Sequence, residues 1–88
     1  MLSNIGSEST GRVLPASNAF AITPSDTDDL PQYTRGLYVG GAGTVVVLMA
    51  DDEATVAFVA VPTGSLLPLR VQRVMNGGTT ATNIVGVY

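Results

Sequence analysis

Two apolar runs of six residues on either side of an acidic turn constrain the fold of this chain more than any other feature. Residues 44–49 are TVVVLM, residues 50–55 are ADDEAT, and residues 56–61 are VAFVAV. The runs are short and rich in β-branched Val, which favours strands over a helix. Apolar residues fall on both faces of each run, whereas a sheet with one wet face alternates apolar and polar residues. We therefore predict a central β-hairpin that is covered on both faces.

The flanking segments also have the pattern of short strands. Apolar runs at residues 18–23, 35–39, 65–75 and 82–88 are separated by turn residues at the spacing typical of all-β proteins. Pro68 inside the longest run implies an edge strand or a bulge, and the glycines within 40–43 predict a tight hairpin turn. We expect an all-β fold, a small antiparallel β-sandwich or barrel of about six strands, in a single domain at residues 18–88.

Residues 1–17 differ from the rest of the chain. They are rich in Ser, Gly and Thr and show no hydrophobic periodicity. We predict an N-terminal arm that is disordered alone or docks on a neighbour. The arm has neither a basic start nor a long apolar core, so we expect no signal peptide. No run in the chain reaches the roughly 18 apolar residues that a membrane helix needs.

The composition predicts a homo-oligomer. Of the 88 residues, 45% are hydrophobic and only 12% are charged, about half the usual ~25%. A domain this small has a modest core and a large surface, so an apolar, charge-poor surface suggests coverage by a neighbour. Without cysteine or histidine the chain has no disulfide and no His/Cys metal site, which leaves oligomerisation as the usual support. The composition does not give the symmetry, so a trimer and a pentamer are both open.

The residues absent from the sequence argue against several kinds of chemistry. Without His, Cys or Lys the chain lacks an imidazole base, a thiolate nucleophile and a lysine base for a serine nucleophile. The net charge of −3, with four cationic residues in all, argues against nucleic acid as a partner. We predict a non-enzymatic protein with no cofactor and with neither a nucleic-acid nor a membrane partner.

Two clusters of acidic residues need separate interpretation. Asp26, Asp28 and Asp29 could supply oxygens to Ca²⁺, but the glycine and terminal glutamate of a calcium loop are missing. A helix cap or a solvated loop is the favoured interpretation. Residues 51–53, Asp-Asp-Glu, lie at the predicted hairpin tip, where they point outward rather than flanking a cleft as glycosidase carboxylates do.

The arginines are candidates for contacts between subunits. Arg35, Arg70 and Arg73 lie on predicted strands, and arginine is well suited to interface ion pairs. Our hypothesis is that one or more of them pairs with the Asp26–Asp29 cluster of a neighbouring subunit. The alternative, of equal weight, is a pair within one chain or a solvated strand face.

Four segments carry a resemblance to a known family. They are FAITPSDTDDLP (20–31), TRGLYVGGAGTVVVL (34–48), VPTGSLLPLRVQRV (61–74) and GGTTATNIVGVY (77–88). In this order they resemble the spike base proteins of gene transfer agents and related tailed phages. The resemblance covers the chain from Phe20 to Tyr88. One departure is the hairpin tip, where the family has glycine and this chain has three acidic residues.

The resemblance implies a virion structural protein, assembled in the bacterial host cytoplasm. Such proteins are oligomeric pedestals on the particle, commonly at capsid vertices, that hold a spike or fibre, so other virion proteins are the expected partners. A capsid decoration protein would have the same composition, with the arm gripping the shell. A third possibility is a small carbohydrate-binding module for host attachment. Its stacking platform would have to come from Tyr33, Tyr38 and Tyr88, because the chain has no Trp.

Overall fold

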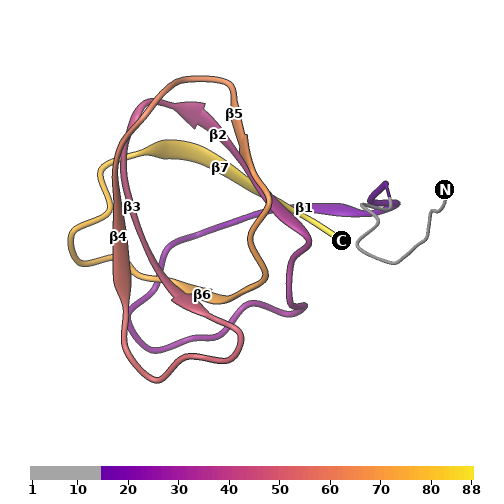
Figure 1. Cartoon of the computed structure of the whole chain (residues 1–88), viewed down its shortest axis with the longest axis horizontal. Coiled ribbons are helices and arrows are strands. Elements are labelled where there is room, and N and C mark those ends of the chain that lie inside the picture. The colour runs from indigo at the N-terminus through magenta and orange to yellow at the C-terminus, as the bar shows by residue number, and fades with distance from the viewer. Residues whose placement is uncertain (1–14) are drawn as a thin grey trace, which may run out of the picture.

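The computed structural model describes residues 15–88, which form seven β-strands in two antiparallel sheets and contain no helix (Figure 1). The all-β prediction is confirmed, with one strand more than expected. Residues 1–14 of the predicted arm lie outside the described residues. The strands are β1 (Ala19–Ala21), β2 (Gly36–Gly41), β3 (Gly43–Met49), β4 (Val56–Val61), β5 (Ser65–Leu67), β6 (Val71–Val74) and β7 (Thr82–Val87).

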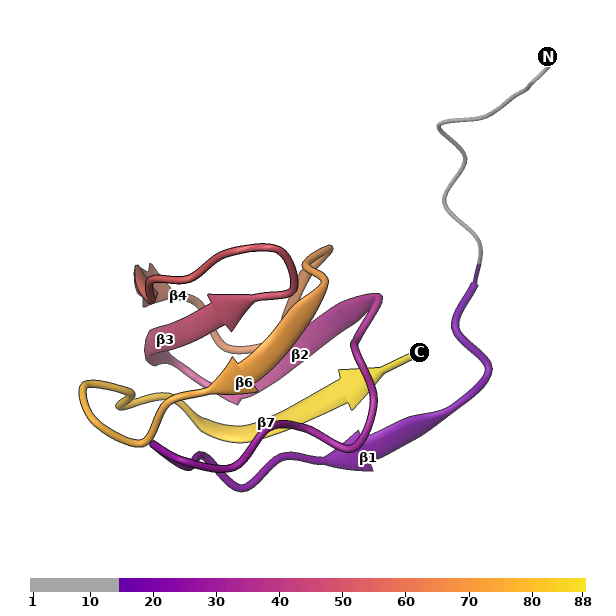
Figure 2. The same cartoon turned by 90° about the horizontal axis from the view of Figure 1, so that it is seen from below.

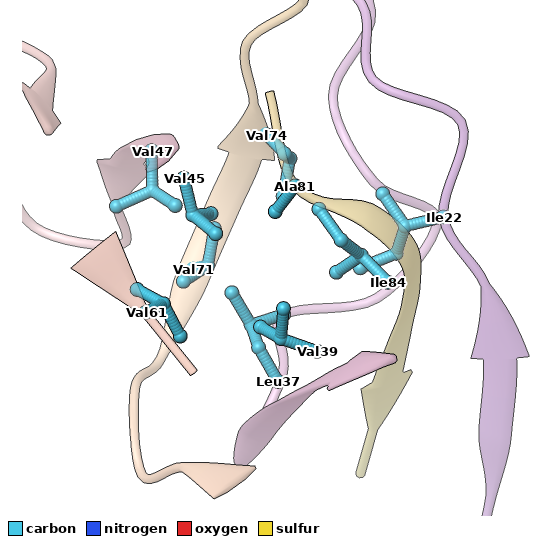
Figure 3. Close-up of a cluster of buried hydrophobic side chains, with 10 residues drawn as sticks. All are labelled: Ile22, Leu37, Val39, Val45, Val47, Val61, Val71, Val74, Ala81 and Ile84. Carbon is cyan, nitrogen blue, oxygen red and sulfur yellow. The ribbon is translucent and has the colours of Figure 1, made fainter. Parts of the chain in front are cut away.

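The two sheets enclose one hydrophobic core. The four-stranded sheet has the order β1-β7-β2-β5, and the three-stranded sheet has the order β4-β3-β6. Both sheets supply inward-facing side chains, which meet in the middle (Figure 3). Burial of each such aliphatic side chain stabilises the fold by roughly 1.5–3 kcal/mol. The buried apolar residues are Ile22, Leu37, Val39, Val45, Val47, Val61, Val71, Val74, Ala81 and Ile84.

The predicted central hairpin is β3 and β4. Strand β3 lies between β4 and β6, and its residues Val45 and Val47 are fully buried. Strand β4 pairs only with β3, and apart from Val61 its residues are exposed or half-buried. We expected both faces of this strand to be covered, and in the single chain this expectation fails for β4. Residues 56–61 form an edge strand, and an apolar run alone does not show whether a strand lies at the edge or in the middle of a sheet.

The glycines within 40–43 form a corner and not the expected hairpin turn. Strands β2 and β3 follow each other with only Ala42 between them, yet they belong to different sheets. The chain can turn here because Gly43 lies against the β6–β7 connection. A Cβ atom on Gly43 would lie 2.6 Å from the Ala81 nitrogen and 2.7 Å from the Thr80 hydroxyl. Any larger residue would push the two segments apart.

The single strand expected at residues 65–75 is divided into β5 and β6, which lie in different sheets. Pro68 separates them, and proline cannot donate to a strand ladder. The amide of Leu69 donates to the carbonyl of Leu67 at 2.8 Å, which closes a three-residue turn. The prediction of one long strand was therefore wrong, although the predicted edge position of Pro68 agrees with β5 as the outer strand of its sheet.

Thr34 holds this second corner in place. Its hydroxyl donates to the carbonyl of Leu69 at 2.8 Å and accepts from the amide of Val71 at 3.1 Å. Thr34 is buried, with 1% of its surface exposed. The two backbone groups at the crossing from one sheet to the other are thus satisfied by a single side chain, where water has little access.

Replacing Thr34 should destabilise the domain through these two groups. Thr34→Val keeps the shape but leaves a buried donor and a buried acceptor unpaired, which we expect to lower the free energy of unfolding by about 2–4 kcal/mol. Thr34→Ser keeps the hydroxyl and should cost only about 1 kcal/mol for the lost methyl group. Urea unfolding followed by circular dichroism measures both values. Equal losses in the two variants would contradict the proposed role of the hydroxyl.

Residues 24–31 run along the outer edge of β6. The amide of Ser25 donates to the carbonyl of Val74, and the amide of Leu30 donates to the carbonyl of Gln72, both at 2.9 Å. The Ser25 hydroxyl accepts from the amides of Thr27 and Asp28 without starting a helix. This loop covers the edge of β6, so β4 is left as the uncovered edge of the three-stranded sheet.

Within the described part of the chain no helix could span a membrane.

Candidate interaction surfaces

Arg73 forms an ion pair inside the chain. Its Nη2 lies 2.7 Å from Asp29 Oδ1, and its Nε donates to the same oxygen at 2.8 Å. Both side chains are partly exposed, so a pair of this kind contributes about 1 kcal/mol at most. For these two residues the structure contains an ion pair within one chain, which was the alternative to a pair between subunits. A role of Arg73 or Asp29 between subunits stays a prediction.

The other two acidic residues of the loop are used separately. Asp26 Oδ1 accepts from the amides of Asn76 and Gly77, at 3.0 and 2.8 Å, and so joins the loop to the turn between β6 and β7. Asp28 accepts only a long bond of 3.4 Å from the hydroxyl of Thr27. Within residues 15–88 no three acidic side chains are grouped in a way that could hold a metal ion. The carboxylates therefore act as loop and turn contacts.

Arg35 and Arg70 line a polar hollow of about 540 Å³. Neither forms a salt bridge with any of residues 15–88. The guanidinium of Arg70 lies 5.1 Å from the centre of the Tyr33 ring, a cation–π contact. The two arginines and two tyrosines, Tyr33 and Tyr88, border the hollow. Such a site could receive a carboxylate or a sugar.

The three tyrosines do not form one platform. Tyr88 packs against Phe20, with ring centres 5.7 Å apart and planes tilted by 59°. One face of the Tyr33 ring is covered by Arg70. Tyr38 lies elsewhere, on β2 directly opposite Leu66 of β5. The three candidate stacking residues are thus divided between the polar hollow and another part of the four-stranded sheet.

A second, apolar hollow of about 380 Å³ lies at the β5 side of the four-stranded sheet. Gly36 is one of its lining residues, and the side chains of Val87 and Leu66 lie close to it, since a Cβ there would lie 3.3 Å from Val87 Cγ2 and 3.4 Å from Leu66 Cδ1. Leu66 is 62% exposed, although it is a large apolar residue. We call this the β5 hollow. Its lining residues are Pro15, Ala16, Arg35, Gly36, Leu66, Pro68 and Val87.

The uncovered edge strand β4 presents a second apolar surface. Val59 is 72% exposed and Val56 is 46% exposed. We call the edge-strand residues Val56–Ala60 the β4 strip. The strand carries no charged residue and no proline, which are the devices that usually block association through a sheet edge. The acidic residues 51–53 lie immediately before the strip in the chain.

A bulge lies within the β4 strip. Gly43 pairs with Val61 and Val45 pairs with Phe58, so β4 has one more residue than β3 over this interval. Ala60 takes up the extra residue with a φ of 59°. A left-handed conformation is unfavourable for alanine by roughly 1–2 kcal/mol. The chain therefore bears backbone strain next to Val59, the most exposed large apolar side chain among residues 15–88.

Ala60→Gly should relieve this strain. Glycine adopts positive φ freely, so we expect the variant to raise the free energy of unfolding by about 1 kcal/mol. The matched control is Ala57→Gly in the same strand, which has no positive φ and should lose about 0.5–1 kcal/mol. Urea unfolding at one fixed protein concentration measures both. A loss of stability in Ala60→Gly would contradict strain at this position.

The sequence analysis identified neither apolar surface, because it selected charged residues as the contacts between subunits. A signal was present in residues 56–61, where polar residues do not alternate with apolar ones. Nothing in the local sequence indicated that Leu66 and Gly36 line a surface, because their exposure depends on the pairing of β5 with β2.

Comparison with known proteins finds a solved structure that matches most of the chain. It is described as the capsid of the native GTA particle computed with C5 symmetry. The TM-score is 0.75, the sequences are 40% identical, and the match covers 84% of each chain. No protein-family model and no curated protein matches the chain.

Proposed function

We propose that this chain, which belongs to the same family as the matched protein of the GTA capsid, is a non-enzymatic structural protein of a phage-like particle. The observation that supports this most strongly is 40% identity over 84% of both chains, together with a shared fold. The fold is all β, and residues 15–88 contain no cluster of metal-binding residues. A role in assembly agrees with a domain that leaves two apolar surfaces open.

In the finer form of the proposal the protein is a homo-oligomeric spike base or a capsid decoration subunit that anchors a spike or fibre. A pentamer is better supported than a trimer, because the matched capsid structure was computed with C5 symmetry. A ring with the symmetry of a capsid vertex can contact every capsid subunit around that vertex in the same way. The predicted arm would then contact the shell or a neighbouring subunit.

The proposal predicts that the protein copurifies with particles. A tagged copy, expressed in cells that produce the particles, should sediment with them through a density gradient and remain after a salt wash. Immunogold labelling of intact particles locates the tag. Absence of the tagged protein from purified particles, when the untagged major capsid protein is present, would refute the proposal.

Copy number and position distinguish the two finer roles. A spike base should label only the vertices and be present in few copies relative to the major capsid protein. A decoration protein should label the whole shell in amounts close to those of the major capsid protein. Quantitative mass spectrometry of purified particles gives the ratio.

A second candidate function is carbohydrate binding in the polar hollow. The observation in its favour is that Tyr33 and Tyr88 border the hollow together with Arg35 and Arg70. An arginine side chain could bind the carboxylate of an acidic sugar. Against it, the Tyr33 and Tyr88 rings each already pack against another side chain.

The carbohydrate candidate predicts selective binding of acidic glycans. The purified chain should bind them on a glycan array, and Arg35→Gln with Arg70→Gln should abolish the signal while the circular dichroism spectrum stays that of the folded chain. Arg73→Gln is the matched control, because Arg73 is not among the residues that line the hollow. No signal from the wild-type chain would remove this candidate.

A further inference from the structure

We infer that the β4 strip of one subunit docks on the β5 hollow of a second copy of this chain, in a head-to-tail contact. The inference rests on the proposed homo-oligomer and names the surfaces that form it. Neither surface was among the residues predicted from the sequence. The argument depends on complementary shape, complementary charge and the relative positions of the two surfaces.

The two surfaces are complementary in shape and in polarity. The β4 strip presents Val59 outward at a bulge, and the β5 hollow is a concave surface lined mostly by apolar residues. Both surfaces are apolar, so contact between them would remove the exposed Val59 and Leu66 from water. Association also gives the uncovered edge of β4 the neighbour that edge strands without charge or proline usually require.

The charged residues beside the two surfaces have opposite signs. The acidic residues 51–53 precede the β4 strip, and Arg35 borders the β5 hollow. Arg35 has no carboxylate within salt-bridge distance among residues 15–88. If the strip lies on the hollow with residues 51–53 toward Arg35, the acidic side chains meet the arginine of the second copy. If the strip lies in the opposite direction, they do not. The charge pattern therefore selects one orientation of the second copy.

The positions of the two surfaces exclude contact within one chain. Strand β4 lies on one side of the domain, and the start of β2 and the end of β7 lie on the other side (Figures 1 and 2). In Figure 1 the acidic turn is below β4, and the start of β2 is below β5. The acidic turn and the start of β2 thus lie in the same direction from the strand beside each of them.

A rotation about an axis parallel to that direction would place β4 of one copy against β5 of the next. Because the two contacting surfaces are different, the contact is not two-fold symmetric. Repeated contacts of this type close into a ring when the rotation allows it. The contact is therefore compatible with a cyclic pedestal, and it does not fix the number of subunits.

Cysteine cross-linking tests the pairing directly, because the natural chain contains no cysteine. Full-length Val59→Cys and Leu66→Cys, one of them with a tag, are mixed, allowed to exchange subunits and oxidised. A disulfide needs Cα atoms within about 7 Å, so we expect a cross-linked pair with one copy of each variant. Val59→Cys mixed with Asn76→Cys, at an exposed residue of the turn between β6 and β7, is the control. Cross-linking no stronger than this control, or stronger between two Val59→Cys copies, would overturn the inference.

A charge substitution supplies the second test. Val59→Asp would bury an unpaired charge in the contact and should weaken the oligomer on the order of 100-fold. Val59 is mostly exposed in the single chain, so the melting temperature of the dissociated subunit should not fall. Asn83→Asp adds the same charge at an exposed position whose φ of 53° aspartate tolerates, and it should leave the oligomer intact. Native mass spectrometry across a dilution series measures all three proteins.

The outcomes separate this inference from the proposed function. A wild-type chain that is monomeric at every concentration would overturn the second copy as occupant, while copurification with particles would still support the structural role. An intact Val59→Asp oligomer would also overturn it. If the Val59→Asp oligomer were intact but absent from particles, the β4 strip would be a contact with another virion protein. Loss of wild-type protein from particles would refute the proposed function alone.

Discussion

The architecture depends on how the backbone crosses from one sheet to the other at Pro68. Proline ends β5, and the next residues must enter the second sheet while their polar groups are buried. The hydroxyl of Thr34 bonds one acceptor and one donor at this crossing, on Leu69 and Val71. Without it, two backbone groups would be buried without partners at a cost of about 1–3 kcal/mol each. The position of β6 beside β3, and so the closure of the core, follows from this contact.

The same arrangement leaves two apolar surfaces of the single chain uncovered. The core uses the inward side chains of both sheets, and the loop at residues 24–31 covers the edge of β6. Nothing among residues 15–88 covers β4, and a hollow lies beside β5. In the proposed homo-oligomer a second copy would cover both places. Burial of these surfaces would then add stability that a small core cannot supply alone.

The charged side chains have different roles. Asp26 and the pair of Arg73 with Asp29 hold the 24–31 loop against β6 and the following turn, so they support the fold from its surface. Arg35 and Arg70 lack such partners within the described residues and border open hollows. In a chain with so few charges, this separation distinguishes the arginines that stabilise one subunit from those available to a partner.

The sequence by itself determined the fold class, the strands other than the 65–75 run, and the expectation of a partner. These depend on local properties: Val-rich runs favour strands, Gly and Pro favour turns, and a charge-poor composition indicates covered surface. The resemblance to spike base proteins also pointed to the phage-like particle that the matched capsid supports.

Tertiary structure decided the sheet to which each strand belongs. Residues 40–43 look like a hairpin turn and residues 65–75 look like one strand, yet both are corners between sheets. Hydrogen bonds between distant residues, such as Thr34 with Val71, determine those crossings. The same pairing exposes Leu66 and Val59. Whether an apolar residue is buried or presented to a partner depends on neighbours that are remote in the chain, so local sequence patterns do not specify it.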